Sequence, residues 1–207
     1  MGYQKKERIA GAAVLILFLC AVLIHYRWGS WGFYRAVPEA EASLRRQVVS
    51  QAESWLGANE ADGSHQAIID LYNTIEPLPV GYIVQYSDSW CATFVSVVSL
   101  QAGITEILPV ECSCGRQIDL LNSLDCWEEN DDAIPQPGDL IYYDWDQQDQ
   151  GESLGWADHV GIVVGCKWPF IKVIEGNKDD SVTYRYLILG HKSIRGYGLP
   201  KYSTAIR

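Results

Sequence analysis

The earliest hydrophobic pattern in the chain is an uncharged apolar run at residues 10–24, which follows a polar and basic N-terminus. The run is shorter than the roughly 20 residues of a full bilayer span, so a cleaved signal peptide is one interpretation. Bulky aromatic residues follow the run, however, where a cleavage site would have small ones. We therefore predict an uncleaved single-pass anchor in residues 1–27, with its basic end in the cytoplasm and the chain from about Trp28 onward outside.

A linker and a series of helices are predicted next. The linker, residues 28–41, contains Pro38, and apolar residues at helical spacing begin at Leu44. Glycines at positions 57 and 103 are placed as helix terminators. The predicted helices cover residues 44–56, 66–72, 92–102 and 116–124.

The predicted helix at 92–102 is apolar on nearly every face, which indicates a buried central helix. The polar residues 87–89 lie just before it and favour an N-cap. We therefore expect Cys91 at the N-terminus of the central helix.

The second half of the chain changes to strand-like segments separated by loops rich in Gly, Pro, Asp and Asn. Because helices come first along the chain and antiparallel strands second, we predict an α+β fold with a sheet of about five to six strands. We predict one folded domain over residues 42–207, since the length leaves little room for a second. The predicted strands cover residues 140–143, 159–164, 170–175, 182–189 and 194–197.

The charge of the predicted domain is strongly acidic. The whole chain has a formal net charge of −10, and residues 1–27 hold four basic residues against one acidic residue, so the other 180 carry −13. An acidic body without a basic stripe lacks the electrostatic footprint of a nucleic-acid-binding protein. Nucleic acid is therefore not an expected partner.

Six cysteines are present, and Cys20 lies in the apolar run. The number of cysteines outside the membrane is odd, and in an oxidising compartment this indicates that one thiol is kept free for chemistry. The others are expected to form up to two disulfides, with Cys126 closing a loop onto Cys112 or Cys114. A zinc site at those three is disfavoured because it lacks a CxxC pair and a fourth ligand. The five cysteines outside the run are Cys91, Cys112, Cys114, Cys126 and Cys166.

Two residues carry the candidate chemistry. A thiol at a helix N-terminus, as expected for Cys91, feels a positive partial charge that favours the reactive thiolate, although such a cysteine is often just a buried hydrophobe. His159 opens a predicted strand, and Gly161 on the same face leaves room for a substrate beside the imidazole. Glu175 and Asn177, two apart on the next strand, are both candidates to orient that imidazole.

These residues resemble the CHAP family of cysteine, histidine-dependent amidohydrolases/peptidases. The resemblance lies in Trp90–Val95, Pro137–Asp139, Asp158–Val163, Glu175–Asn177 and Arg195–Gly198, in that order, and extends over about 160 residues. It implies a papain-like fold and hydrolysis of amide bonds in peptidoglycan. It also implies the roles of nucleophile for Cys91, general base and acid for His159, and orienting group for Glu175 or Asn177.

The resulting expectation is a membrane-anchored extracytoplasmic peptidoglycan hydrolase that cleaves wall peptides and needs no cofactor or metal. An assembly of the cell envelope is a further expected partner. Two alternatives remain: a catalytically silent wall-binding or scaffolding module of the same fold, and a secreted lysin or toxin if the apolar run is cleaved.

Three further groups of residues could have either a functional or a structural role. Trp90, Trp156 and Tyr82 are candidates to line a substrate groove, although aromatic residues beside a buried helix more often belong to the core. His65 and His191 show no partner pattern and are expected to be structural. Some CHAP relatives bind calcium, and this chain has a cluster of acidic residues between two predicted strands. The cluster departs from the EF-hand pattern, however, and is expected to be a solvated loop. That cluster consists of Asp144, Asp146, Asp149 and Glu152.

Overall fold

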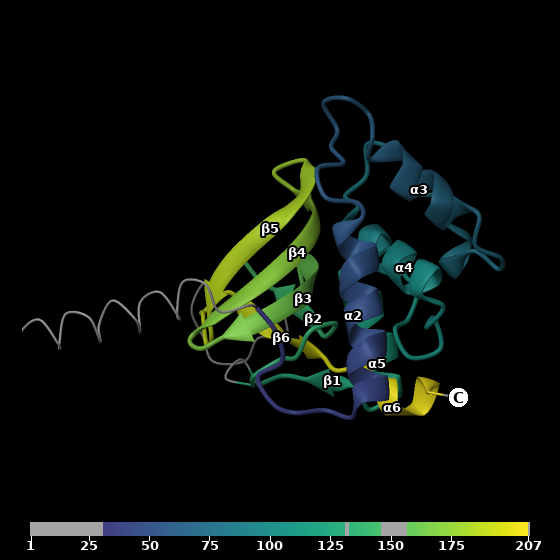
Figure 1. The fold of residues 1–207 in the computed structure, drawn as a ribbon. Helices are drawn as coiled ribbons and strands as arrows, with labels where there is room; N and C mark the ends of the chain where they lie inside the picture. The colour runs from purple at the N-terminus through teal and green to yellow at the C-terminus, as the bar shows by residue number, and fades with distance from the viewer. Residues whose placement is uncertain (1–30, 131–132, 146–156, 207) are drawn as a thin grey trace, which may run out of the picture. The chain divides into compact units, whose positions relative to one another are not determined.

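A computed structural model describes residues 31–130, 133–145 and 157–206 of the 207-residue chain. In these ranges most of the helices precede the strands (Figure 1). The helices are α2 (Glu39–Glu53), α3 (Gln66–Asn73), the 3₁₀ turn η1 (Pro79–Gly81), α4 (Cys91–Ala102), α5 (Cys114–Ser123) and α6 (Tyr202–Ala205). The strands are β1 (Trp127–Glu128), β2 (Leu140–Tyr143), β3 (His159–Lys167), β4 (Phe170–Lys178), β5 (Ser181–Ile188) and β6 (Ile194–Gly198).

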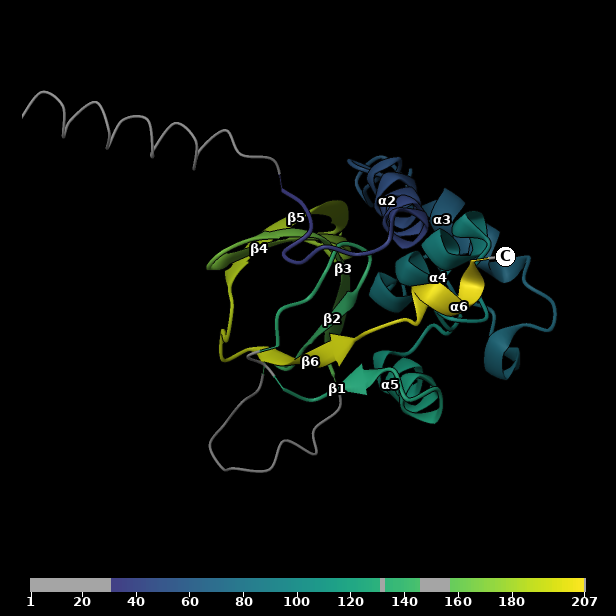
Figure 2. The same ribbon diagram turned by 60° about the horizontal axis from the view of Figure 1, so that its bottom comes forward.

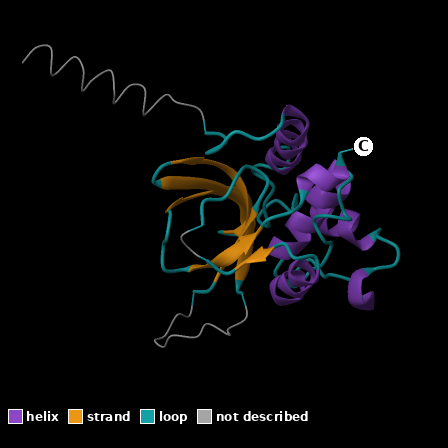
Figure 3. Ribbon diagram, turned by 90° about the horizontal axis from the view of Figure 1, so that it is seen from below, coloured by secondary structure: helices purple, strands orange, loops and turns teal. Residues whose placement is uncertain are grey.

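The predicted α+β class is confirmed: strands and helices occupy separate layers (Figure 3). The sheet of the described residues has six strands in the order β1-β6-β2-β3-β4-β5, and all neighbouring pairs are antiparallel (Figure 2). The five longer strands agree with those predicted. The short strand β1 was not predicted, because two residues are too few to show an alternating pattern.

Helix α2 begins at Glu39, inside the stretch predicted as a linker. Pro38 precedes its first turn, and the carboxylates of Glu39 and Glu41 there interact favourably with the positive end of the helix dipole. Gly32, earlier in the same stretch, pairs with Cys166 of β3 in an isolated bridge.

The central sheet separates two hydrophobic cores because alternate residues of each strand face opposite sides. On β2, Leu140 and Tyr142 point into the larger core beneath the helices, whereas Ile141 and Tyr143 point into a smaller core on the other side. Helix α4 is buried along almost its whole length in the larger core. This confirms the prediction of a buried central helix.

Helix α4 approaches β4 closely at Gly176. A Cβ atom at this position would lie 2.5 Å from the Cβ of Phe94 and 2.9 Å from the Trp90 ring. Because real Cβ atoms do not approach so closely, only glycine lets α4 and β4 pack in this way. The start of α4, where Cys91 lies, is thereby held against the sheet.

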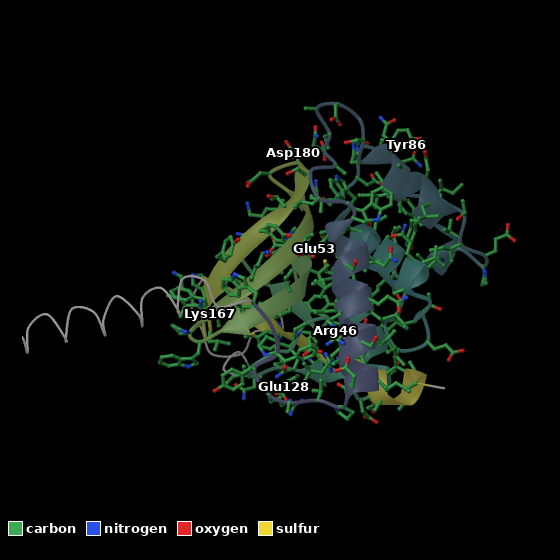
Figure 4. All side chains as sticks on the ribbon, viewed as in Figure 1. Arg46, Glu53, Tyr86, Glu128, Lys167 and Asp180 are labelled. Atoms are coloured by element: carbon green, nitrogen blue, oxygen red, sulfur yellow. The ribbon has the colours of Figure 1, made fainter. Side chains whose placement is uncertain are left out.

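Polar contacts join the middle of helix α2 to the segment just before β2, and its C-terminal end to β5. The buried guanidinium of Arg45 donates to the Asp139 carboxylate at 2.7 Å and to the Pro137 carbonyl at 3.0 Å. Glu53, the last residue of α2 and labelled in Figure 4, accepts a hydrogen bond from the hydroxyl of Tyr184 on β5. These contacts fix α2 against the strands that follow it in the chain.

The predicted anchor at residues 10–24 lies outside the described residues. Within the ranges that the structure describes, no helix combines the length and the apolar character that crossing a bilayer requires.

Replacing Gly176 by Ala is expected to lower the free energy of unfolding by about 1–3 kcal/mol, because the added methyl group overpacks the contact between α4 and β4. Urea denaturation of the two proteins measures the difference. Gly32→Ala is the matched control, since a Cβ there meets no atom within 4 Å, and a change below about 0.5 kcal/mol is expected. Equal losses in both variants would contradict the packing interpretation.

Candidate active site

Cys91 is the first residue of α4, as predicted, and its side chain is buried, with 5% of the residue exposed. The polar residues before it provide no side-chain cap in the structure. Asp88 instead accepts hydrogen bonds from the backbone N–H of Gln85 and the hydroxyl of Tyr82. The uncapped N-terminus leaves the positive end of the α4 dipole directed at the thiol.

Three groups surround the Cys91 sulfur. The thiol of Cys114, the first residue of α5, lies 3.6 Å away, sulfur to sulfur. The imidazole of His159 and the backbone N–H of Val160 also bond to the sulfur. The hydrogen bond from Cys114, together with those from His159 and Val160, outweighs burial and holds the pKa of Cys91 well below that of an ordinary thiol. This is the electrostatic setting of a thiolate nucleophile.

His159 opens β3, as predicted, and bridges Cys91 and Glu175. Its Nε2 lies 3.1 Å from the Oε2 of Glu175, so Nδ1 is the ring nitrogen left for the thiol. Burial opposes a charge on the imidazole, but the hydrogen bonds to Cys91 and Glu175 outweigh it and raise the pKa of His159 to about 9. The arrangement therefore favours an imidazolium beside a thiolate.

Glu175 is fully buried and is held by three donors from three other strands. The hydroxyl of Tyr143 on β2 donates at 2.7 Å, His159 on β3 at 3.1 Å, and the Nε of Arg185 on β5 at 2.8 and 2.9 Å. Burial alone would raise the pKa of Glu175, but the hydrogen bonds from His159 and Arg185 keep it below its usual value. The carboxylate thus stays ionised and fixes the imidazole.

Gly161 leaves room for Glu175 rather than for a substrate. A Cβ at position 161 would lie 2.6 Å from the Cγ of Glu175 and 2.6 Å from a methyl group of Val173. The expected substrate space beside the imidazole is therefore filled by protein. The missing side chain lets Glu175 extend across β3 to His159.

Asn177 is placed differently from Glu175, although it lies only two residues further on. The pairing of β4 with β5 shifts between Glu175 and Lys178, and Asn177 has a positive φ of 57°. This irregularity breaks the alternation on which the prediction rested. The Asn177 amide donates to Glu60, which also accepts a hydrogen bond from the Trp90 indole, so Asn177 supports the start of α4 rather than the imidazole.

Two of the three aromatic residues predicted to line a groove are described. Trp90 is fully buried in the larger core, which corrects its assignment to a substrate surface. Tyr82 is about half exposed, with its hydroxyl bound to Asp88. Trp156 lies outside the described residues.

The acidic cluster is described only in part. Asp144 is buried, whereas Asp146, Asp149 and Glu152 lie outside the described residues. Among the described residues, no group of three or more His, Cys, Asp or Glu side chains is arranged to hold a metal ion.

The expected disulfides are not formed: all five cysteines in the described part of the chain are free thiols. Each sulfur has a different neighbour, which is why the proposed pairings fail. Cys112 donates to Glu111, Cys126 to the Leu124 carbonyl and Cys166 to the Pro135 carbonyl. Cys114 lies beside Cys91 instead.

Sequence reasoning missed four neighbours of the site. Tyr143 pairs directly with His159 between the antiparallel strands β2 and β3. The end of one predicted strand and the start of the next could have predicted this pairing. Trp145 stacks on Tyr143, with ring centroids 4.8 Å apart, and Arg185 lies over both rings. For Cys114 the available signal was its place just before a helical pattern, the same signal that identified Cys91.

Residues 81–177 match the model described as the CHAP domain. This stretch is similar to CHAP domains. It contains α4, β2, β3 and most of β4, and therefore all three residues of the Cys91, His159 and Glu175 arrangement. The CHAP resemblance noted in the sequence is confirmed.

Few other proteins are similar to this chain. No curated protein matches the chain. Four chains of solved structures match. Two of them are the crystal structure of Ly7917 and that of Ly7917 with the hydrolyzing product of MDP, at 10% and 12% identity and TM-scores of 0.43 and 0.38. The alignments cover 76% and 75% of this chain but only 62% of each Ly7917 chain, so the protein spans less than two thirds of their length.

Replacing Glu175 by Gln should lower the pKa of His159 from about 9, because the variant removes the carboxylate that stabilises the imidazolium. NMR titration of the histidine ring protons measures this shift. Asn177→Gly is the matched control, since glycine accepts the positive φ and only the contact with Glu60 is lost. An unchanged pKa in Glu175→Gln, or equal shifts in both variants, would show that Glu175 does not set the charge of His159.

Proposed function

We propose that this protein is a peptidoglycan hydrolase that cleaves amide bonds of the wall peptides by cysteine nucleophilic catalysis. The observation that carries the proposal is the continuous contact from the Cys91 thiol through the His159 imidazole to the buried Glu175 carboxylate. Its occurrence within a stretch similar to CHAP domains supports amide hydrolysis as the reaction. In this proposal Cys91 is the nucleophile, His159 the base and acid, and Glu175 the positioning residue.

The first step is attack of the Cys91 thiolate on an amide carbonyl carbon, which forms a tetrahedral intermediate. The negative charge moves from sulfur to the carbonyl oxygen, near the uncapped N-terminus of α4. Backbone N–H groups there are suited to bind that oxygen, and one such donor contributes about 3 kcal/mol in other hydrolases. His159, already an imidazolium, then donates its proton to the departing amine.

The second step releases the acyl group from Cys91. His159, neutral after protonating the amine, accepts a proton from a water molecule that attacks the thioester. The thiolate leaves, and the proton on His159 restores the starting ion pair. Glu175 keeps the ring orientation constant throughout, because three strands hold its carboxylate.

Location is part of the same proposal. The apolar run at residues 10–24 would anchor the chain in the membrane with the CHAP-like domain on the outer side, where its substrate is found. The predicted domain carries no basic stripe, which favours wall peptides over nucleic acid as the partner. An envelope assembly that needs a local opening in the wall would be a suitable partner for such a hydrolase.

Digestion of purified peptidoglycan by the full-length chain tests the proposal. The wild type is expected to release soluble fragments with new amino termini, and Cys91→Ala is expected to release none while keeping its melting temperature within a few degrees. Mass analysis of the fragments identifies which amide bond is cut. Ser54→Ala is a suitable control, because that side chain is exposed and bonds only to the Gln51 carbonyl at the end of α2.

Two results would separate the alternatives. Equal release by wild type and Cys91→Ala would rule out cysteine catalysis by Cys91. Binding of peptidoglycan by both proteins, without release by either, would favour the silent scaffolding module.

A further inference from the structure

Cys114 is a second thiol at the site, and the proposed hydrolysis gives it no covalent role. Its sulfur lies 3.6 Å from that of Cys91. Both side chains are buried and both thiols are free. The pair is therefore positioned for chemistry between the two sulfurs.

The distance between the two sulfurs is short enough for a disulfide to form after a small movement. A disulfide bond is about 2.05 Å long, so the sulfurs would need to approach by about 1.5 Å. Each cysteine is the first residue of its helix, α4 or α5, where side-chain rotation can supply such an approach without melting a helical turn. The other described cysteines have carbonyl or carboxylate neighbours instead.

We propose that Cys91 and Cys114 form a reversible disulfide, so that this pair is a redox modification site that blocks the nucleophile. The oxidant belongs to the class of low-molecular-weight disulfides, such as glutathione disulfide. The effect of the bond on activity rests on the proposed function, whereas its formation does not.

The reaction balances in two exchanges. The Cys91 thiolate attacks one sulfur of the oxidant, the oxidant's S–S bond breaks, and the departing thiolate takes the proton of the His159 imidazolium. Cys114 then loses its proton, attacks the Cys91 sulfur of the mixed disulfide and expels the second thiolate, which takes that proton. The oxidant is reduced to two thiols, and the cysteine pair is oxidised by two electrons.

The electrostatics of the pair order these exchanges. While Cys91 is a thiolate, the hydrogen bond that Cys114 donates to it raises the pKa of Cys114 well above that of an ordinary thiol. Cys91 is therefore the first of the two to attack. Once Cys91 is a mixed disulfide its negative charge is gone, and the pKa of Cys114 falls towards the range where it can react.

Mass analysis after oxidation tests the proposal directly. The reduced full-length chain is incubated with excess glutathione disulfide, remaining thiols are alkylated, and the protein is cleaved after Glu106 and Glu111, which separates Cys91 from Cys114. The wild type is expected to give a linked pair of peptides with two hydrogens fewer and no glutathione. In Cys114→Ser, Cys91 is expected to keep a glutathione adduct, because the resolving thiol is missing.

Cys112→Ser is the matched control, because Cys112 is two residues from Cys114 but its sulfur contacts Glu111. This variant should still form the linked peptides. A wild type in which Cys91 stays unmodified or stays glutathionylated would overturn the proposal, as would a linkage that survives in Cys114→Ser. The wild-type result decides the question even if a variant folds poorly.

The activity assay separates this inference from the proposed function. Peptidoglycan release by the oxidised wild type is expected to fall to the level of Cys91→Ala and to recover with a thiol reductant. Reduced protein that releases nothing would contradict the proposed function and leave the linkage result intact. Reduced protein that is active but forms no linkage would contradict only the redox site.

Discussion

The buried charge of Glu175 is the constraint on which the site depends. An ionised carboxylate without water costs several kcal/mol unless donors surround it. Here Tyr143, His159 and Arg185 supply those donors from β2, β3 and β5, on both sides of the strand that carries Glu175. Satisfying one carboxylate therefore fixes the relative register of four strands and the orientation of the imidazole.

The second requirement is that the thiol on α4 reach that imidazole. Side chains ordinarily fill the space between a helix and the sheet on which it packs, and so keep the two backbones apart. Gly176 removes a side chain at the contact with Phe94 and Trp90, and Glu60 ties Trp90 to Asn177. The start of α4 is thus held close to the sheet by packing and hydrogen bonds that involve neither Cys91 nor His159.

Much of the fold was predictable because its signals are local. The all-round apolar helix after Trp90, the alternating strands and the glycine after Ala102 specify their own elements, and the α+β class follows from their order. The places of Cys91 and His159 at the starts of α4 and β3 were predictable for the same reason.

The remaining errors arose where contacts join distant segments. Asn177 was placed on the same face as Glu175 because alternation was assumed through an irregular strand end. Arg185 carries no local signal, since its role depends on pairing between β4 and β5. Cys114 was only a candidate, with Cys112, for a structural disulfide to Cys126, because spacing along the chain does not show that α5 starts beside α4.

The central claim is that Cys91 and His159 form a thiolate–imidazolium pair, because both the attack on a carbonyl and the protonation of the amine depend on it. Difference absorbance of the thiolate, recorded on reduced wild type and Cys91→Ala as the pH is lowered from neutrality, measures it most directly. We expect a thiolate signal that is present in the wild type at neutral pH, persists well below the usual pKa of a thiol and is missing in Cys91→Ala. Identical spectra for the two proteins at neutral pH would contradict it.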